Sequence, residues 1–345
     1  MAVKDARPTG VLLVNLGTPD SPAVRDVRRY LREFLSDPRV LDVSAPARWL
    51  LLHALILPFR PRRAARQYAS IWLPEGSPLL VHGRALAAAL ATTLGERFRV
   101  ALGMRYGSPS LAGALEELVA ADVSKIVVLP LFPQYASSSG GSALARVFAL
   151  AGARWNVPAL DAVSDFHDDP GFVEAFAAVA RPVLADFRPD HVLLSYHGLP
   201  ERHVRKSDPT GRHCLASAEC CATIGRANRH CYRAQCFATS RALATALALA
   251  PARHSVSFQS RLGRDPWLRP YTDERLPELA RAGVRRLALL CPAFVADCLE
   301  TVEEIGIRAR DQWASLGGEA LALVPSLNAS PRWVEAVAAL VRARA

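Results

Sequence analysis

The sequence predicts an α/β protein with two parallel, doubly wound sheets, one in each half of the chain. Short apolar segments rich in valine and leucine alternate with longer amphipathic segments, which is the pattern of parallel strands joined by helices. Each half contains four such strand segments. Similar sequences even recur at the same place in the two halves, namely Lys125-Ile-Val-Val-Leu-Pro and Arg286-Leu-Ala-Leu-Leu-Cys-Pro. We therefore expect two sheets of four parallel strands, flanked by helices, with a ligand cleft between them.

In the first half, buried apolar runs predict four strands, at Gly10–Leu16, Val100–Tyr106, Lys125–Leu131 and within Trp155–Val163. After the first strand, Asp20 or Ser21 can cap a helix at 23–35 with Pro22 in its first turn. That helix places apolar residues on one face. A further helix is expected at Leu111–Ala121. The loop 132–142 is rich in serine and glycine and leads into another helix.

The second half repeats this rhythm. Its strands are expected at His191–Tyr196, Ser255–Ser260, Arg286–Cys291 and Ala320–Val324. Helices are expected at Phe172–Phe187, Cys236–Leu249, Leu276–Ala282, Cys298–Trp313 and Pro331–Ala343. A chain of 345 residues is long for one core and suits two domains. We expect these at 1–170 and 171–330, followed by a C-terminal helix at 331–345.

Composition limits the classes of partner. Hydrophobic residues make up 51% of the chain, so it is globular rather than disordered. The net charge of +10 favours acidic partners such as a polycarboxylate or an anionic membrane surface. No zinc-finger or RNA-binding pattern is present, which argues against nucleic acid. No G-x-G-x-x-G or Walker A motif indicates a nucleotide.

The N-terminal residues carry no secretory signal pattern, and no apolar run reaches the roughly 20 residues of a spanning helix. We expect a cytoplasmic protein, where thiols stay reduced. The segment 45–63 has an unusual composition, since Trp49–Leu57 is nearly all apolar and is followed by Arg60, Arg62 and Arg63. It is either a buried helix with a charged end or a lip that touches a membrane or a flat apolar ligand.

His197 follows the strand at 191–196 and precedes Gly198 and Pro200. Open α/β sheets bind ligands at the carboxyl ends of their strands, and an imidazole accepts protons near neutral pH. Glu300 and Glu304 lie four residues apart, on one face of the helix expected after the strand at 286–291. Carboxylates in this place suit a hard divalent cation or proton transfer, although early acidic residues also stabilise helices.

Five of the seven cysteines gather in one polar insert at 207–236, at positions Cys214, Cys220, Cys221, Cys231 and Cys236. Thiols in a reduced compartment read better as metal ligands than as disulfides. Four thiolates fit zinc or an iron–sulfur cluster, and the spacing matches no standard pattern of either. Cys291 and Cys298 lie on core elements and are expected to be inert.

Several motifs, in order along nearly the whole chain, resemble ferrochelatase. They are Asn15-Leu-Gly-Thr-Pro, Leu31-Arg-Glu-Phe-Leu-Ser-Asp, Met104-Arg-Tyr-Gly-Ser-Pro-Ser, Leu131-Phe-Pro-Gln-Tyr, Ser195-Tyr-His-Gly-Leu-Pro, Phe258-Gln-Ser-Arg-Leu-Gly, Trp267-Leu-Arg-Pro-Tyr-Thr, Ala296-Asp-Cys-Leu-Glu-Thr and Ser326-Leu-Asn-Ala-Ser-Pro. The resemblance implies a pair of Rossmann-like domains and a lyase that inserts Fe²⁺ into protoporphyrin IX, giving protoheme and two protons.

The resemblance also implies roles for individual residues. His197 matches the histidine that takes pyrrole protons, binds the incoming Fe²⁺, or both, and Glu300 matches the partner glutamate across the pocket. Glu304 would continue an acidic track. The segments that line the pocket contribute Arg105, Tyr106, Tyr135 and Ser137. The lip at 45–63 matches the pocket mouth that touches the bilayer in membrane-associated relatives, so peripheral contact with the inner face of the membrane is expected.

Two departures refine this reading. Ala136 stands where animal relatives carry a cluster cysteine, and their cysteine-bearing tail is absent, so an animal-type cluster is excluded. The insert is similar to that of some bacterial members that hold a [2Fe–2S] cluster. We expect Cys214, Cys231 and Cys236 as ligands, with either Cys220 or Cys221 as the fourth, and zinc as the alternative.

The second departure concerns the substrate. Relatives that act on coproporphyrin have tyrosine where this chain has Leu16, which favours protoporphyrin. The competing readings are a chelatase of the same fold for coproporphyrin or another tetrapyrrole, and a non-catalytic haem or iron–sulfur sensor. The presence of both His197 and Glu300 argues against the sensor.

Overall fold

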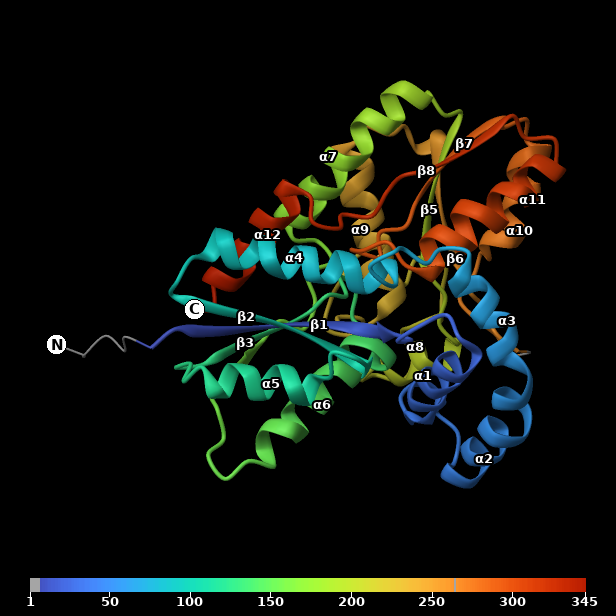
Figure 1. The fold of residues 1–345 in the computed structure, drawn as a ribbon. Coiled ribbons are helices and arrows are strands. Elements are labelled where there is room, and N and C mark those ends of the chain that lie inside the picture. Colours follow the sequence, from blue (N-terminus) through green and yellow to red (C-terminus); the bar gives the residue numbers. More distant parts are fainter. Residues whose placement is uncertain (1–6, 264) are drawn as a thin grey trace. The chain divides into compact units, whose positions relative to one another are not determined.

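The computed structural model describes residues 7–263 and 265–345, which form two compact units (Figure 1). Unit 1 consists of Met1–Leu131, Ser137–Asp165 and Val334–Ala345, and unit 2 consists of Phe132–Ala136 and Phe166–Trp333. Each unit contains one four-stranded sheet. Every strand pair in the two sheets is parallel, which confirms the predicted architecture of four parallel strands in each half.

The sheet of unit 1 has the order β2-β1-β3-β4. Central β1 and β3 are apolar and almost wholly buried, because helices cover both faces of the sheet. Figure 1 shows α4 on one side of the strands and α5 and α6 on the other. The elements are β1 (Thr9–Thr18), α1 (Val24–Ser36), α2 (Ala45–Leu50), η1 (Leu51–Ile56), α3 (Leu57–Ala69), α4 (Pro78–Leu94), β2 (Phe98–Gly107), α5 (Leu111–Ala120), β3 (Ile126–Pro130), η2 (Ser137–Gly141), α6 (Ser142–Gly152) and β4 (Leu160–Ala162).

The sheet of unit 2 has the order β6-β5-β7-β8, with β5 and β7 at its centre. Trp313 and Ile305 pack against Leu193 in the core on one side of this sheet. The elements are α7 (Pro170–Phe187), β5 (His191–His197), α8 (Glu201–Lys206), α9 (Tyr232–Ala246), η3 (Pro251–Arg253), β6 (His254–Gln259), α10 (Thr272–Arg281), β7 (Arg286–Leu290), η4 (Leu299–Ala309), α11 (Arg310–Ser315), β8 (Ala320–Leu323) and α12 (Pro331–Arg342), whose residues from Val334 onward belong to unit 1.

The carboxyl end of β1 requires glycine. Gly17 pairs with Tyr106 of β2 and has φ of 123°, a conformation that residues with a Cβ rarely adopt. A Cβ placed there would lie 1.9 Å from the carbonyl oxygen of Tyr106. Gly17 therefore lets β1 and β2 stay paired as far as the loop that leads to α1.

The structure differs from the sequence-based prediction in two respects: one helix was not predicted, and some segments are π-helical. No element was predicted for residues 64–99, where α4 lies, because its many alanines are apolar on every face and weaken the helical period. The helix expected at Cys298–Trp313 is divided into the π-helix η4 and the short α11. The residues around 51–56 and 137–141 are also π-helical. Such segments are rare and often occur at functional sites.

Candidate active site

His197 is the last residue of β5, and its imidazole is held by the turn that follows. Nδ1 lies 2.6 Å from the carbonyl oxygen of Gly198, which can only accept, so Nδ1 carries the proton in that hydrogen bond. The basic lone pair of the neutral ring is then on Nε2. A Cβ on Gly198 would lie 2.9 Å from the carbonyl oxygen of Gln259, so glycine is needed for this turn beside β6.

Two aromatic rings flank the imidazole of His197. The ring centroids of Trp267 and Phe294 lie 6.5 Å and 6.4 Å from that of His197. Trp267 comes from the loop after β6, and Phe294 comes from the loop between β7 and η4. These rings present apolar surface beside a basic nitrogen, an environment that suits a flat aromatic ligand.

The π-helix η4 supplies the carboxylates of Glu300 and Glu304. Glu304 is held by Ser260, whose backbone amide lies 2.9 Å from Oε1 and whose hydroxyl donates to Oε2. Burial raises the pKa of Glu304, and the charge of Glu300 acts in the same direction, whereas Ser260, Arg308 and His197 oppose the rise. Within unit 2, His197 and Glu300 therefore both lie near enough to Glu304 for their charges to act on its carboxyl.

Gln259, the last residue of β6, connects the elements that carry this group. It lies opposite His197 in the strand register. Its Oε1 accepts a hydrogen bond from Ser195 of β5 at 2.7 Å, and its Nε2 donates to the carbonyl oxygen of Glu300 at 2.8 Å. Gln259 is 3% exposed, so these bonds are shielded from water. Sequence reasoning did not single out Gln259 or Ser260, because their roles depend on strand register rather than on local pattern.

Glu303 differs from its two neighbours. Its carboxylate accepts a hydrogen bond from Arg308 at 2.9 Å, and its side chain is 8% exposed. Arg308 also approaches Glu304 at 3.8 Å. Glu303 is therefore engaged by Arg308, whose side chain is 47% exposed, and this ion pair holds Arg308 next to Glu304.

In unit 1, Arg105 and Tyr106 form a polar cluster with Asp37 and Ser142. One carboxylate oxygen of Asp37 accepts hydrogen bonds from all three, at 2.6 Å, 2.8 Å and 2.5 Å respectively. Burial acts to raise the pKa of Asp37, but these bonds, that of the Arg39 amide and the charge of Arg105 together hold its pKa below the usual value. The Asp37 carboxylate thus fixes the direction of Arg105.

Arg105 and Tyr106 differ in burial, and this difference indicates different roles. The side chain of Arg105 is 17% exposed, whereas Tyr106 is fully buried and its pKa is raised by burial. Tyr106 therefore orients Asp37 and is not a surface that a ligand touches in this structure. Ser137 begins η2, and its hydroxyl accepts a hydrogen bond from Arg39 at 2.9 Å. Leu16 is partly exposed near the carboxyl end of β1.

Tyr135 lies in unit 2, in contact with the cysteine insert. Its ring centroid is 5.2 Å from that of His230, and its backbone amide donates to Gln235 at 2.6 Å. Sequence reasoning had grouped Tyr135 with Ser137 as lining residues. The structure assigns the two to different units.

The insert is ordered by two polar side chains. Asp208 accepts hydrogen bonds from the amides of Cys214, His213 and Thr210, and these bonds lower its pKa far below the usual value. Asn228 donates to the carbonyl oxygen of Cys220 at 2.9 Å. Both side chains hold the backbone around the thiols.

All five thiols of the insert are buried. The Sγ atoms of Cys220 and Cys221 lie 3.7 Å apart. Cys231 is within hydrogen-bond reach of both Cys214 and Cys221, and its bond with Cys221 is the main cause of the raised pKa of the latter. Burial raises the pKa of Cys236.

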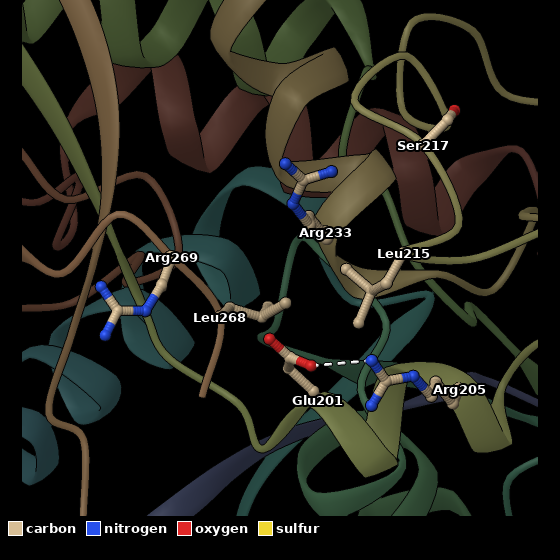
Figure 2. Close-up of a pocket in the computed structure, with 7 residues that line it drawn as sticks. All are labelled: Glu201, Arg205, Leu215, Ser217, Arg233, Leu268 and Arg269. Carbon is tan, nitrogen blue, oxygen red and sulfur yellow. Dashed lines mark hydrogen bonds and ion pairs between the residues drawn. The ribbon is translucent and has the colours of Figure 1, made fainter. Parts of the chain in front are cut away.

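The insert supplies enough thiols for a four-thiolate centre, but in the described residues no three His, Cys, Asp or Glu side chains are arranged to hold a metal ion. Arg233 places Nη1 3.1 Å from the Sγ of Cys221, a position that favours a thiolate. Arg233 also lines a pocket of about 280 Å³ with Glu201, Arg205, Leu215, Ser217, Leu268 and Arg269 (Figure 2). Cys291 and Cys298 are buried, and burial raises the pKa of each thiol.

The lip, defined here as residues 45–63, is a continuous helical run of α2, η1 and the first part of α3. Four of its large apolar side chains are exposed, namely Trp49 at 64%, Leu50 at 59%, Leu55 at 60% and Phe59 at 73%. Leu52 and Leu57 are buried instead and anchor the lip to the unit. In the described part of the chain, no helix has the length and apolar character needed to cross a bilayer.

The ferrochelatase family model matches residues 8–345. A ferrochelatase of Coxiella burnetii (strain CbuK_Q154) is 50% identical over 342 residues, which cover 99% of this chain and 95% of that protein. A ferrochelatase of Legionella pneumophila (strain Lens) is 46% identical over 332 residues, covering 96% and 98%.

Among solved structures, SirB from Bacillus subtilis with Fe³⁺ superposes with a TM-score of 0.52 at 14% identity, covering 97% of this chain and 94% of that one. This likeness supports the fold. The sequence matches extend over nearly the whole chain. The chain therefore belongs to the ferrochelatase family, the lyases that insert Fe²⁺ into a porphyrin ring in the synthesis of haem.

Proposed function

We propose that the porphyrin substrate is protoporphyrin IX and that His197 is the group that receives its pyrrole protons or binds the incoming Fe²⁺. The observation that carries this proposal is geometric: Gln259 lies opposite His197 in the strand register and donates a hydrogen bond to the carbonyl oxygen of Glu300, so the end of β5 and the start of η4 are held together. In the balanced reaction, one Fe²⁺ enters the ring, two N–H bonds break, and two protons leave. The three side chains provide a base and a route for those protons.

The geometry of His197 supports a role at Nε2. The bond from Nδ1 to the carbonyl oxygen of Gly198 fixes the tautomer, so Nε2 can accept a proton or bind a metal ion without a rotation of the ring. Trp267 and Phe294 beside it exclude water from one side. A positioned base of this kind typically contributes about 10²–10⁴-fold to a proton transfer.

Glu304 suits the next step of proton transfer. Its raised pKa, caused mainly by burial, lets it hold a proton at a higher pH than an exposed glutamate does. Ser260 and Arg308 keep the carboxylate in place. We propose that protons pass from His197 toward Glu304 and that Glu300 faces the metal ion.

Substrate choice is tested with the purified protein under anaerobic conditions. Fe²⁺ is supplied with protoporphyrin IX or with coproporphyrin III, and the appearance of each haem is followed by absorption. We expect faster insertion into protoporphyrin IX, and Leu16→Tyr should shift the preference toward coproporphyrin III. Faster insertion into coproporphyrin III by the unaltered chain would contradict the proposal and support the alternative branch.

In unit 1, we propose that Arg105 and Ser137 meet the propionates or ring edge of the porphyrin. Asp37 aims the guanidinium of Arg105, whose side chain retains 17% exposure. Tyr106 contributes by holding Asp37. Arg105→Lys keeps the charge but loses the second hydrogen bond, from Nε to Ser142 at 2.8 Å, so we expect weaker porphyrin binding with less effect on the insertion step.

We further propose that four thiols of the insert hold a [2Fe–2S] cluster, with Cys214, Cys231 and Cys236 joined by Cys220 or Cys221. The mutual contacts of the thiols and the guanidinium of Arg233 support a site for a negatively charged thiolate centre. When bound, the cluster would supply one-electron redox chemistry. Anaerobic purification followed by absorption spectra and iron, sulfide and zinc analysis decides the matter, since one zinc without colour would contradict the cluster.

The exposed apolar side chains of the lip support peripheral contact with the inner face of the membrane by a protein of the cytoplasm. Trp49 and Phe59 are exposed on the lip, and no helix in the described residues is long and apolar enough to cross a bilayer. An amphipathic surface of this kind rests at the boundary of headgroups and acyl chains. Flotation with liposomes of phosphatidylcholine and phosphatidylglycerol tests this contact.

A further inference from the structure

The face of α1 next to the lip carries a cavity of about 350 Å³ lined by arginine side chains. These are Arg25, Arg28, Arg29 and Arg32, and His53 and Leu57 close the cavity from η1 and α3. The arginines stand at i, i+3, i+4 and i+7, so they share one face of the helix. All four are exposed. In Figure 1, α1 lies beside α2 and α3.

The positive charge of this arginine cavity is only partly neutralised. Arg29 pairs with Asp20 at 2.5 Å and with Asp26 at 3.0 Å, and Arg25 approaches Asp26 at 3.5 Å. By contrast, Arg28 and Arg32 form no ion pair with a carboxylate among the described residues. Like charges one helical turn apart repel each other, so an anion held between them would relieve that repulsion.

The cavity and the exposed lip form one continuous surface. His53 lines the cavity, and its ring centroid lies 5.0 Å from that of Trp49, which is 64% exposed. Leu57 lines the cavity as well, and Phe59, two residues further, is 73% exposed. A bilayer offers this combination of chemistry, with phosphate at the headgroup and hydrocarbon just below it.

We propose that the arginine cavity binds the phosphate of an anionic phospholipid while the lip enters the acyl boundary. Arginine suits this ligand, since its planar fork donates two parallel hydrogen bonds to a phosphate. The proposal deepens the membrane contact proposed above. It adds a defined binding site and a preference for phosphate lipids, which an apolar surface alone would not have.

The test uses the full chain and vesicles of matched surface charge. Phosphatidylcholine vesicles are doped with phosphatidylglycerol in one series and, to the same surface potential, with oleate in the other. Arg28→Gln/Arg32→Gln removes the two unpaired charges. Arg97→Gln/Arg99→Gln is the control. It removes the same net charge from two exposed arginines at the start of β2, which do not line the cavity.

We expect the unaltered chain to prefer phosphatidylglycerol over oleate and the Arg28/Arg32 variant to bind it about tenfold or more weakly, with its preference lost. The Arg97/Arg99 control should keep the preference. Equal binding to both vesicle series by the unaltered chain would overturn the phosphate site, because diffuse attraction responds only to surface charge. A weaker affinity of Arg28→Gln/Arg32→Gln for detergent-solubilised porphyrin would also overturn it, by assigning the cavity to the substrate's carboxylates.

A third variant separates this proposal from the lip contact on which it rests. Trp49→Ser/Phe59→Ser should lose binding to both vesicle series, because it removes apolar contact and leaves the arginines in place. If this variant loses binding and the Arg28/Arg32 variant does not, the lip contact stands and the phosphate site falls. If Trp49→Ser/Phe59→Ser retains full binding, the lip contact fails, and with it the proposal that the lip enters the acyl boundary.

Discussion

Acidification should destabilise the chain through His191, the first residue of the strand that carries His197. The His191 side chain is 7% exposed, with Nε2 2.8 Å from the hydroxyl of Ser255. Burial lowers its pKa to about 4, and the charges of Arg275, His254 and Arg253 act in the same direction. An unfolded histidine titrates near a pKa of about 6.5. At a pH between these two pKa values, His191 is protonated in the unfolded chain and neutral in the folded chain.

The magnitude follows from the two pKa values. A difference of about 2.5 units, at about 1.36 kcal/mol per unit, amounts to about 3 kcal/mol in the free energy of unfolding. This contribution is fully present above a pH of about 6.5 and is lost as the pH falls to about 4, since protonation then favours the unfolded chain.

The assay compares urea unfolding of the unaltered chain and of His191→Asn at several pH values, followed by circular dichroism. Because other groups titrate in both proteins, the informative quantity is how their difference changes with pH. We expect the advantage of the unaltered chain over the variant to shrink by about 3 kcal/mol on acidification. Exposed His53 replaced by asparagine is the control. A difference between the unaltered chain and His191→Asn that stays constant with pH would refute the reasoning.

Three other predictions concern the site and the lip. The raised pKa of Glu304 makes the unaltered chain less stable as the pH rises above the ordinary glutamate range, and Glu304→Gln removes that carboxyl. The stability of the variant relative to the unaltered chain should therefore grow with pH, and its rate of Fe²⁺ insertion should fall. A difference in urea midpoints that does not change with pH would contradict this. Cys236→Ser should bleach any cluster absorption, and unchanged iron and sulfide content would exclude Cys236 as a ligand. Phe59→Ser should weaken liposome binding by about tenfold, since most of a phenylalanine's burial energy is at stake, and unchanged flotation would show that Phe59 stays out of the bilayer.

The alternation of apolar strands with amphipathic helices was sufficient to predict both sheets, because parallel strands buried on two faces have a distinctive composition. The same signal did not predict α4, whose alanines hide its period. Nor did it distinguish the π-helical turns of η4 from an α-helix, since both place apolar residues three to five positions apart. Hydrogen-bond pattern, rather than residue type, separates these two helices.

The candidate site shows a similar division. His197 was recognisable from its place at a strand end, and Glu300 and Glu304 from their spacing. Gln259 and Ser260 lie within the family motif at 258–263, but the motif did not indicate their hydrogen bonds to η4, because those bonds depend on the three-dimensional placement of β6 beside η4. Tyr106 illustrates the opposite error, because its position in a family motif suggested ligand contact while its side chain is fully buried against Asp37.

The rate of Fe²⁺ insertion by His197→Ala, measured anaerobically with protoporphyrin IX, tests the role of His197 most directly. Porphyrin affinity is measured on the same samples by fluorescence quenching, and exposed His230→Ala serves as the control that removes an imidazole elsewhere in unit 2. We expect insertion to fall by about 10²-fold or more while porphyrin affinity is retained, because the lost group acts on protons and metal rather than on the ring. Insertion by His197→Ala at the rate of the unaltered chain would contradict the assignment of His197 as proton acceptor or iron ligand.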